Sequence, residues 1–199
     1  DMGVTIEDIK KLKELTGIGL TDAKKALVEA EGNFDSALET LRKKGLTKAE
    51  KKGDRETREG LIESYVHSNR IGVVVEVNCE TDFVARLPEF KEFAHQIAMQ
   101  IAAMSPVYPT IEDVPTDVYE AKKQELLASD ALSSKPAEMA EKIVEGQLKK
   151  HFAEQVLAEQ TFVLDDSMTV GERIKEQIAK SGENIRVSQF KRIELGVTQ

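Results

Sequence analysis

The sequence contains little of what most catalytic, membrane-spanning or disulfide-stabilised proteins depend on. It has one cysteine, three histidines and no tryptophan in 199 residues. A single cysteine, Cys79, cannot form a disulfide within the chain and fits a reducing compartment. No apolar run approaches the roughly 20 consecutive residues that a membrane-spanning helix needs. We therefore expect a cytoplasmic protein that makes no contact with a membrane.

The chain also has fewer basic than acidic side chains, and its formal net charge is −8 at pH 7. A general nucleic-acid binder needs clustered lysine and arginine to neutralise phosphates, so we expect no direct contact with nucleic acid. Most of the acidic excess lies in residues 111–166, whereas residues 42–58 are rich in basic side chains. This polarity can steer the chain onto a partner of complementary charge, or it can reflect a solvated linker beside a solvated helical face.

The sequence offers no convergent set of catalytic or ligand-binding residues. Cys79 lies in an apolar strand pattern, where a cysteine is normally inert packing rather than a nucleophile. The histidines lack the spacing of metal ligands, and no glycine-rich loop of the kind that holds nucleotide phosphates is present. We therefore predict a protein that is not an enzyme and that has no metal site and no cofactor.

Three short amphipathic patterns open the chain and predict a three-helix domain over residues 1–46. Gly17, Gly32 and Gly45 are expected to end the successive helices, because glycine favours the left-handed conformation found just after a helix. Three short helices can bury their narrow apolar stripes only on one another or on a neighbour. Residues 47–60 are polar and basic, and we interpret them as a linker.

The turn between the first two predicted helices contains two glycines, Gly17 and Gly19, around Ile18. Glycine lets the backbone approach another surface closely. The turn could therefore dock on a partner, with Leu20 as an apolar contact and Lys24 as a charge beside it. The other interpretation is that Leu20 begins the core stripe of the second helix and that the lysine is solvated.

From residue 61 onward the patterns change to those of a core domain, which we place at residues 61–199. Two β-type runs flank the turn Ser68-Asn69-Arg70 and predict a hairpin. Pro88 is placed to begin an amphipathic helix long enough to cover that hairpin. Further capping and periodicity signals predict a helix over residues 116–127, a longer helix that begins at residue 137 and a third helix over residues 169–182. A final strand is predicted over residues 185–195.

The predicted fold class is therefore α+β. A small three-helix domain precedes a core in which a three-stranded antiparallel sheet is covered by helices. A sheet this narrow leaves its other face for a partner, and we expect Val74 and Phe190 to make that face apolar in places. The final strand is expected to place Ile185, Val187 and Ile193 on one side.

The stretch from Asn78 to Arg86 joins the end of a strand to a helix through a short polar turn. Its Phe83 stands beside Asp82, and an aromatic ring next to a carboxylate on a connector can act as a probe that fills a partner's pocket and disturbs the charge there. Alternatively, Phe83 folds back onto its own core and Asp82 caps the next turn of helix. Burial of a phenylalanine is worth about 1.5–3 kcal/mol in either place, so spacing alone leaves both interpretations open.

Two segments of the chain closely resemble the bacterial translation elongation factor Ts family. They are TGIGLTDAKKAL at residues 16–27 and VNCETDFVAR at residues 77–86, with weaker support from FKRIELG at residues 190–196. The resemblance covers essentially the whole chain from Met2. It implies a guanine-nucleotide exchange factor of protein biosynthesis, which binds elongation factor Tu and promotes GDP release during translation elongation.

The resemblance also implies where the N-terminal domain and the hairpin make contact. The N-terminal domain is expected to be ubiquitin-associated-like and to dock on the nucleotide-binding domain of the partner through Gly19, Leu20 and Lys24. His67 matches a position in the hairpin turn that faces the third domain of the partner. As a lone histidine it could instead simply end its strand.

A second set of contacts is implied for the turn after the second strand. Thr81, Asp82, Phe83 and Val84 match the positions that reach the helices bordering the partner's magnesium site. Phe83 is expected to wedge between side chains there, so that the displaced helix loses its hold on magnesium and phosphate. The chain itself transfers no proton and no chemical group.

The chain resembles the short form of the family, because residues 65–104 hold its only hairpin-and-helix module whereas longer members have two. The resemblance therefore implies a homodimer in which two chains pair through their small sheets. The main alternative function is a non-catalytic adaptor whose three-helix domain binds ubiquitin-like or nascent chains. Such an adaptor would use a surface independent of Asp82 and Phe83.

Overall fold

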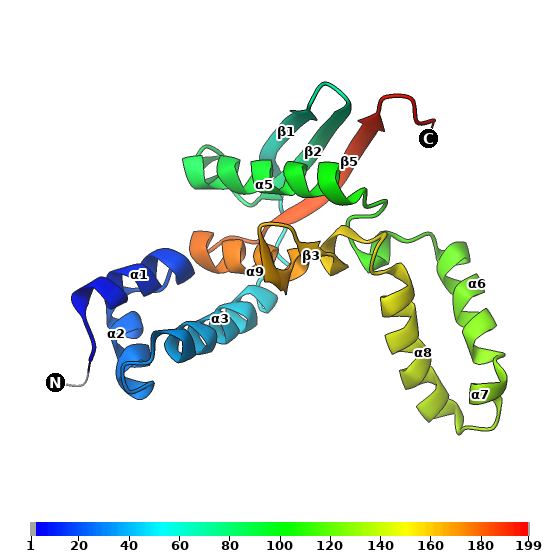
Figure 1. Ribbon diagram of the computed structural model, residues 1–199, viewed down its shortest axis with the longest axis horizontal. Helices are drawn as coiled ribbons and strands as arrows, with labels where there is room; N and C mark the ends of the chain where they lie inside the picture. The colour runs from blue at the N-terminus through cyan, green and yellow to red at the C-terminus, as the bar shows by residue number, and fades with distance from the viewer. Residues whose placement is uncertain (1–2, 199) are drawn as a thin grey trace. The chain divides into compact units, whose positions relative to one another are not determined.

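The computed structural model describes residues 3–198 and has the predicted α+β fold (Figure 1). The chain divides into two compact units. The first unit holds the residues up to Ile62 together with Glu76–Ala94 and Glu172–Val187. The second unit holds Glu63–Val75, His95–Gly171 and the residues from Ser188 onward. The candidate site is built almost entirely on the first unit.

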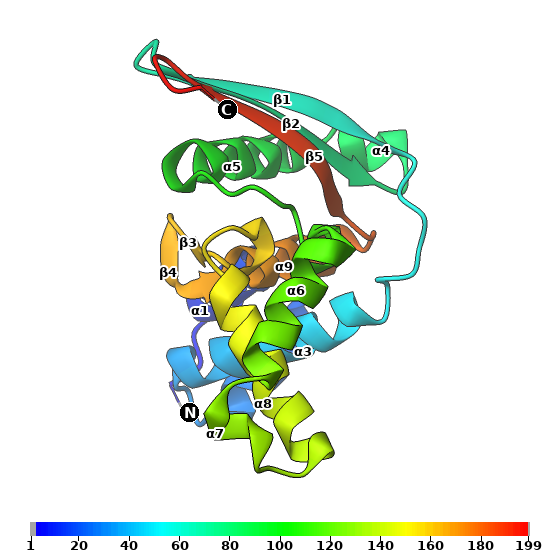
Figure 2. The same cartoon turned by 90° about the vertical axis from the view of Figure 1, so that its right-hand side faces the viewer.

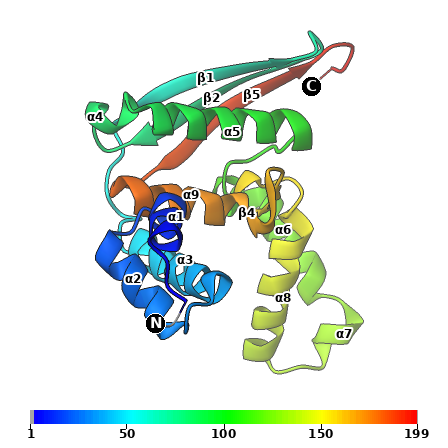
Figure 3. The ribbon, with the colours of Figure 1, turned by 60° about the vertical axis from the view of Figure 1, so that its left-hand side comes forward.

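Three helices open the first unit: α1 (Ile6–Thr16), α2 (Leu20–Glu29) and α3 (Phe34–Glu50). The Thr5 hydroxyl oxygen accepts a hydrogen bond from the Asp8 backbone N–H at 3.0 Å and caps α1. Each helix contacts the other two (Figure 3). The side chains of Leu12, Leu27 and Leu41 are buried between them. Of the two places open to the apolar stripes of these helices, one another or a neighbour, the structure therefore shows burial on one another.

The third helix is longer than the sequence predicts. We expected Gly45 to end it, but α3 continues to Glu50, and Gly45 is buried within it. A Cβ atom at Gly45 would lie 3.4 Å from the Cβ of Ala179, on α9 (Val170–Ser181). This glycine therefore serves close approach between two helices rather than helix termination. The predicted basic linker begins inside the helix and becomes turn only from Lys51.

The main sheet has the strand order β1 (Glu59–His67), β2 (Ile71–Cys79) and β5 (Arg186–Glu194). Strands β1 and β2 form the predicted hairpin, and Ser68 and Asn69 at its turn have φ angles of 50° and 57°. Positive φ at both central residues is typical of the tight turns that suit the twist of a hairpin. Helix α5 (Pro88–Met104) lies along one face of the sheet (Figure 2).

The opposite face of the sheet is apolar and open in the second unit. Val66, Val74 and Ile193 are each about half exposed or more. The prediction that Phe190 belongs to this face is wrong. Phe190 is partly buried, as is Arg192, two residues along the strand, whose guanidinium donates to the Ala102 carbonyl of α5.

The final strand also does not keep Ile185, Val187 and Ile193 on one side. Ile185 and Val187 are buried, whereas Ile193 is 69% exposed. Two consecutive exposed residues, Ser188 and Gln189, stand between the two halves of the strand, so its alternation changes phase there.

The rest of the second unit is mostly helical. Its elements are η1 (Ile111–Asp113), α6 (Thr116–Leu127), α7 (Asp130–Ser133), α8 (Ala137–Phe152), η2 (Leu157–Glu159), β3 (Thr161–Phe162) and β4 (Asp165–Thr169). Helices α6 and α8 run side by side (Figure 1). Val144 and Leu148 of α8 belong to the buried cluster of this region. Strands β3 and β4 form a second, two-stranded sheet. Within residues 3–198, none of the helices combines the length and the apolar character needed to cross a membrane.

Candidate partner-binding site

The polar turn after β2 begins a single turn of helix, α4 (Asp82–Ala85). Thr81 caps it, since its hydroxyl oxygen accepts a hydrogen bond from the Val84 backbone N–H at 3.3 Å. Val84 is buried at 6% exposure, and Phe83 beside it is 73% exposed. The turn therefore holds itself to the fold through Val84 and presents the Phe83 ring to solvent.

The interpretation that Phe83 folds back onto its own core is therefore wrong. The alternative role for Asp82 also fails, because the cap of α4 is Thr81. An oxygen of the Asp82 carboxylate lies 3.0 Å from a guanidinium nitrogen of Arg86, and both side chains are more than half exposed. An ion pair exposed to that degree contributes little stability and can be exchanged for another contact at small cost.

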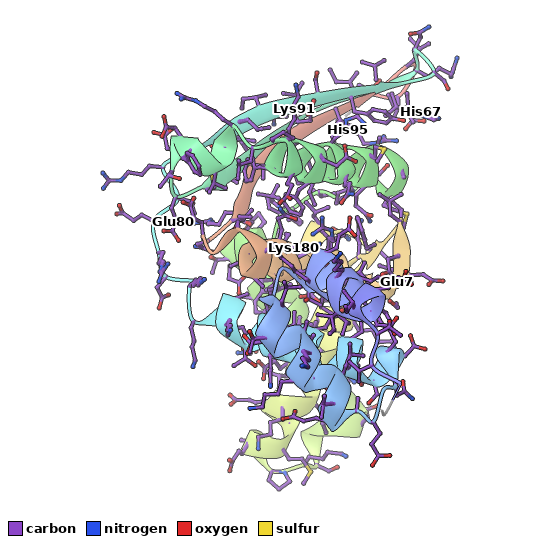
Figure 4. The ribbon with its side chains drawn as sticks, turned by 90° about the vertical axis from the view of Figure 1, so that its left-hand side faces the viewer. Glu7, His67, Glu80, Lys91, His95 and Lys180 are labelled. Carbon is purple, nitrogen blue, oxygen red and sulfur yellow. The ribbon has the colours of Figure 1, made fainter. Side chains whose placement is uncertain are left out.

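A carboxylate from far along the sequence holds the backbone just before Asp82. Glu183, in the loop between α9 and β5, accepts hydrogen bonds from the backbone N–H groups of Glu80 at 3.1 Å and Thr81 at 3.0 Å. Its second oxygen accepts from the Thr81 hydroxyl at 2.7 Å. Sequence reasoning missed Glu183, since it is about a hundred residues from its partners and carries no local motif. Glu80, the first of the residues that Glu183 holds, is labelled in Figure 4.

Cys79 is the last residue of β2, the strand that leads into the turn with Asp82 and Phe83, which we call the tip. Its side chain is fully buried. Burial raises the pKa of its thiol to about 11, and the negative charge of Glu183 adds to the effect. The Cys79 Sγ atom donates to the Thr81 carbonyl at 3.1 Å. The thiol therefore packs beneath the turn, and it remains protonated and unreactive near neutral pH.

The turn between α1 and α2 contains two glycines, and the space around them differs. Gly17 has a φ of 69°, and a Cβ there would lie 2.8 Å from the Lys180 Cα of α9. Gly19 has a φ of −62°, and nothing in the described chain lies within 4 Å of the place its Cβ would occupy. Gly17 is therefore needed inside this chain, whereas the bare backbone at Gly19 faces open space.

Leu20 is the first residue of α2 and is 49% exposed, so the interpretation that it begins the core stripe is wrong. Ala23 takes the buried position on that face of the helix, and Lys24 is exposed. Gly19, Leu20 and Lys24 thus present a bare backbone, an apolar side chain and a positive charge close together at one end of α2.

His67 lies at the end of β1, in the second unit, whereas the other predicted contact residues lie in the first. Its Nδ1 atom lies 2.8 Å from the Tyr65 hydroxyl. The Tyr65 ring in turn meets the His95 ring edge-on at 5.5 Å between centroids. His67 is exposed at the hairpin end, as Figure 4 shows together with His95.

A hollow of about 790 Å³ in the first unit contains none of the predicted contact residues. Its lining includes Lys13, Glu14, Phe93, Arg173 and Lys180. The Arg173 guanidinium lies 5.0 Å from the Phe93 ring centroid and bonds Gln177, so it is used in packing. Within residues 3–198 no three histidine, cysteine or acidic side chains are grouped as metal ligands.

A family model described as Elongation factor TS matches residues 9–197. The chain belongs to the elongation factor Ts family. It is therefore a translation elongation factor. Both segments that carry the resemblance, including the turn at Gly19 and the tip at Phe83, lie inside the matched range.

Curated members of the elongation factor Ts family are similar over nearly their full lengths. The Thermotoga petrophila protein is 54% identical over 196 residues, which cover 98% of each chain. The Fervidobacterium nodosum protein is 52% identical over 98% of this chain and 100% of its own. The Thermodesulfovibrio yellowstonii protein is 47% identical over 100% of this chain and 99% of its own. The similarity therefore extends over nearly the whole of this chain and of each of these relatives.

Proposed function

We propose that this chain is a cytoplasmic guanine-nucleotide exchange factor that binds elongation factor Tu and promotes the release of GDP. Membership of the elongation factor Ts family supports this function. The single observation that carries the mechanism is the 73% exposure of Phe83 on a one-turn helix whose next residue is buried. An aromatic side chain presented in this way is a strong anchor for a partner's pocket.

In this mechanism Phe83 wedges between side chains that border the partner's magnesium site, and Asp82 disturbs the charge there. Of the four predicted contact residues in this segment, Asp82 and Phe83 reach the partner, whereas Thr81 caps the helix that carries them and the buried Val84 anchors it to the fold. Exchange then requires no chemistry in this chain, which is neither an enzyme nor a cofactor carrier. A contact that favours the nucleotide-free conformation of the partner weakens its nucleotide binding by the same factor by which nucleotide weakens the contact.

A second contact is made by the N-terminal domain, residues 1–46, which we propose to be ubiquitin-associated-like. Gly19, Leu20 and Lys24 dock on the nucleotide-binding domain of the partner, and His67 faces its third domain. Several linked contacts raise the overall affinity above that of any one of them, because each later contact forms at high effective concentration. The docking turn therefore contributes mainly to association, and the tip contributes mainly to nucleotide release.

We also propose that two copies of the chain form a homodimer through their sheets. The open face of the second unit supports this pairing, since Val66, Val74 and Ile193 expose apolar side chains on neighbouring strands. A twofold dimer would bury the same patch on both copies. Sedimentation should show a dimer at micromolar concentration, and a monomer there would contradict this part of the proposal.

The function is tested by stopped-flow measurement of labelled GDP leaving elongation factor Tu, with and without this chain. We expect the intact chain to accelerate release, and the variants Phe83→Ala and Asp82→Ala to reduce the acceleration. Unchanged rates in both variants would contradict the wedge mechanism. An adaptor that uses a separate surface would bind its partner equally well with either substitution.

A further inference from the structure

We propose that Glu183 is a positioning residue, whose carboxylate fixes the direction in which Asp82 and Phe83 leave the fold. This inference rests on the exchange function proposed above. It adds a residue that contacts neither the partner nor the nucleotide and acts only through the turn it holds.

Three hydrogen bonds converge on the Glu183 carboxylate. One Glu183 oxygen accepts from the backbone N–H groups of Glu80 and Thr81, at 3.1 and 3.0 Å, and the other accepts from the Thr81 hydroxyl at 2.7 Å. All three donors belong to the two residues just before Asp82. A charged acceptor makes shorter and stronger hydrogen bonds than a neutral one. The two residues that lead into α4 are therefore held by three hydrogen bonds, two from the backbone and one from the Thr81 side chain.

The contact between the Glu80 segment and the Glu183 segment is reciprocal. The Glu80 carboxylate accepts a hydrogen bond from the Asn184 backbone N–H at 2.7 Å, so each segment supplies a carboxylate to the other's backbone. Asn184 is buried, and its side chain donates to the carbonyls of Gly53 at 3.3 Å and Arg55 at 2.8 Å. We call Glu80, Glu183 and Asn184 the polar clamp. It joins the tip, the loop after α9 and the segment that follows α3.

The Glu183 backbone is itself fixed. The Ser181 hydroxyl oxygen accepts from the Glu183 backbone N–H, and the hydroxyl lies 3.2 Å from the Glu183 carbonyl oxygen. Ser181 is the last residue of α9, so the carboxylate is presented from the end of a helix rather than from a free loop.

Helix α4 is too short to hold its own geometry. A helix of four residues is far below the length at which helices are stable alone. Packing anchors it through Val84, and Phe83 and Asp82 both point into solvent. The direction of the Phe83 ring thus depends on the backbone of Glu80 and Thr81, which the polar clamp fixes before any partner arrives. Holding a contact group in its bound geometry beforehand avoids an ordering cost on binding.

The test compares Glu183→Ala with Glu183→Gln in the GDP-release assay, with Glu125→Ala, an exposed carboxylate on α6, as the matched control. Alanine removes all three hydrogen bonds. Glutamine keeps one oxygen for the two N–H groups, and its amide can donate to the Thr81 hydroxyl oxygen. We expect Glu183→Ala to lower the maximal release rate about tenfold, equivalent to about 1.4 kcal/mol. Glutamine should rescue most of that loss, and the concentration for half-maximal effect should change much less than the maximal rate, since the docking turn is untouched.

A second readout needs no partner. Amide hydrogen exchange in the free protein should speed up at Glu80 and Thr81 in Glu183→Ala, while amides of α5 such as those of Ile97 and Ile101 stay protected. Protection in α5 also shows that the variant is folded. Should Glu183→Ala fail to fold, Glu183→Asp, which keeps the charge but draws the carboxylate back by one methylene from its three donors, must still lower the maximal rate.

The outcomes separate the two proposals. If Glu80 and Thr81 lose protection in Glu183→Ala but GDP release keeps its full rate, the positioning role is wrong and the exchange function stands. If Glu183→Gln loses as much activity as Glu183→Ala, the charge matters rather than the geometry, and the positioning role is again overturned. If the unmodified chain does not accelerate GDP release, the exchange function itself fails, and the positioning role fails with it.

Discussion

Replacing Phe83 with alanine should abolish most of the exchange activity and leave the fold intact. An aromatic side chain buries about 150–250 Å² when it is covered. Because 73% of Phe83 is exposed in the free chain, a partner can cover roughly 110–180 Å² of it. At about 25 cal/mol per Å² this corresponds to roughly 3–4.5 kcal/mol of available contact energy.

Part of that energy is spent on ordering the ring and opening the partner's pocket, so we expect about 2–3 kcal/mol to be lost on truncation. If the contact favours the nucleotide-free state, the loss lowers the accelerated rate of GDP release roughly 30- to 150-fold. The same substitution should change the free energy of unfolding by less than about 0.5 kcal/mol, because an exposed side chain contributes little to the fold.

The assay is stopped-flow release of labelled GDP from elongation factor Tu at saturating concentrations of each variant, with thermal unfolding measured in parallel. Phe83→Leu should keep part of the activity, since it retains apolar volume. Val163→Ala, which shortens an exposed apolar side chain in the second unit, is the control. If Phe83→Ala lowers the unfolding temperature by several degrees, the ring supports its own fold. Full exchange activity in that variant would refute the wedge mechanism.

Three further predictions concern other parts of the chain. Gly19→Ser should keep or slightly raise stability, because serine is a good N-cap for α2, yet weaken association with elongation factor Tu in calorimetric titration; unchanged affinity would contradict the docking role. Val74→Glu, at an exposed position, should leave the monomer folded and weaken the dimer at least tenfold in sedimentation, since the interface would bury an unpaired charge; an equally stable dimer would place the interface elsewhere. The raised pKa of Cys79 predicts a pH effect: below its ordinary pKa of 9.0 the thiol is protonated in both states, and above it the unfolded chain loses the proton first. About 2–3 kcal/mol of stability should therefore be lost between pH 9 and 11 in chemical denaturation, and a Cys79→Ala protein with the same loss would assign it to other groups.

Much of the fold follows from local signals in the sequence. The hairpin turn at Ser68 and Asn69, the helix beginning at Pro88 and the helix ending before Gly182 were all predicted, because turn residues and apolar periodicity act over a few positions. The exposed tip was also located, although spacing alone could not decide whether Phe83 pointed inward or outward. That choice depends on whether Val84 or Phe83 fills the space beneath the turn, which is a property of the packed core.

The errors share a physical cause, which is contact between residues far apart in the chain. Gly45 reads locally as a helix end, but its missing side chain serves the approach of α9. The change of phase in β5 moves Phe190 to the covered face, and strand alternation assumed from sequence cannot anticipate it. The hydrogen bonds from Glu183 to Glu80 and Thr81 join residues about a hundred positions apart, and no motif marks them.

The central claim is tested most directly by replacing Phe83 with a photo-crosslinking phenylalanine analogue and irradiating the complex with nucleotide-free elongation factor Tu. We expect cross-links from position 83 to the helices that border the partner's magnesium site, and we expect these cross-links to decrease when GDP and magnesium are added. Cross-links only within this chain, or to a part of the partner remote from its nucleotide, would contradict it.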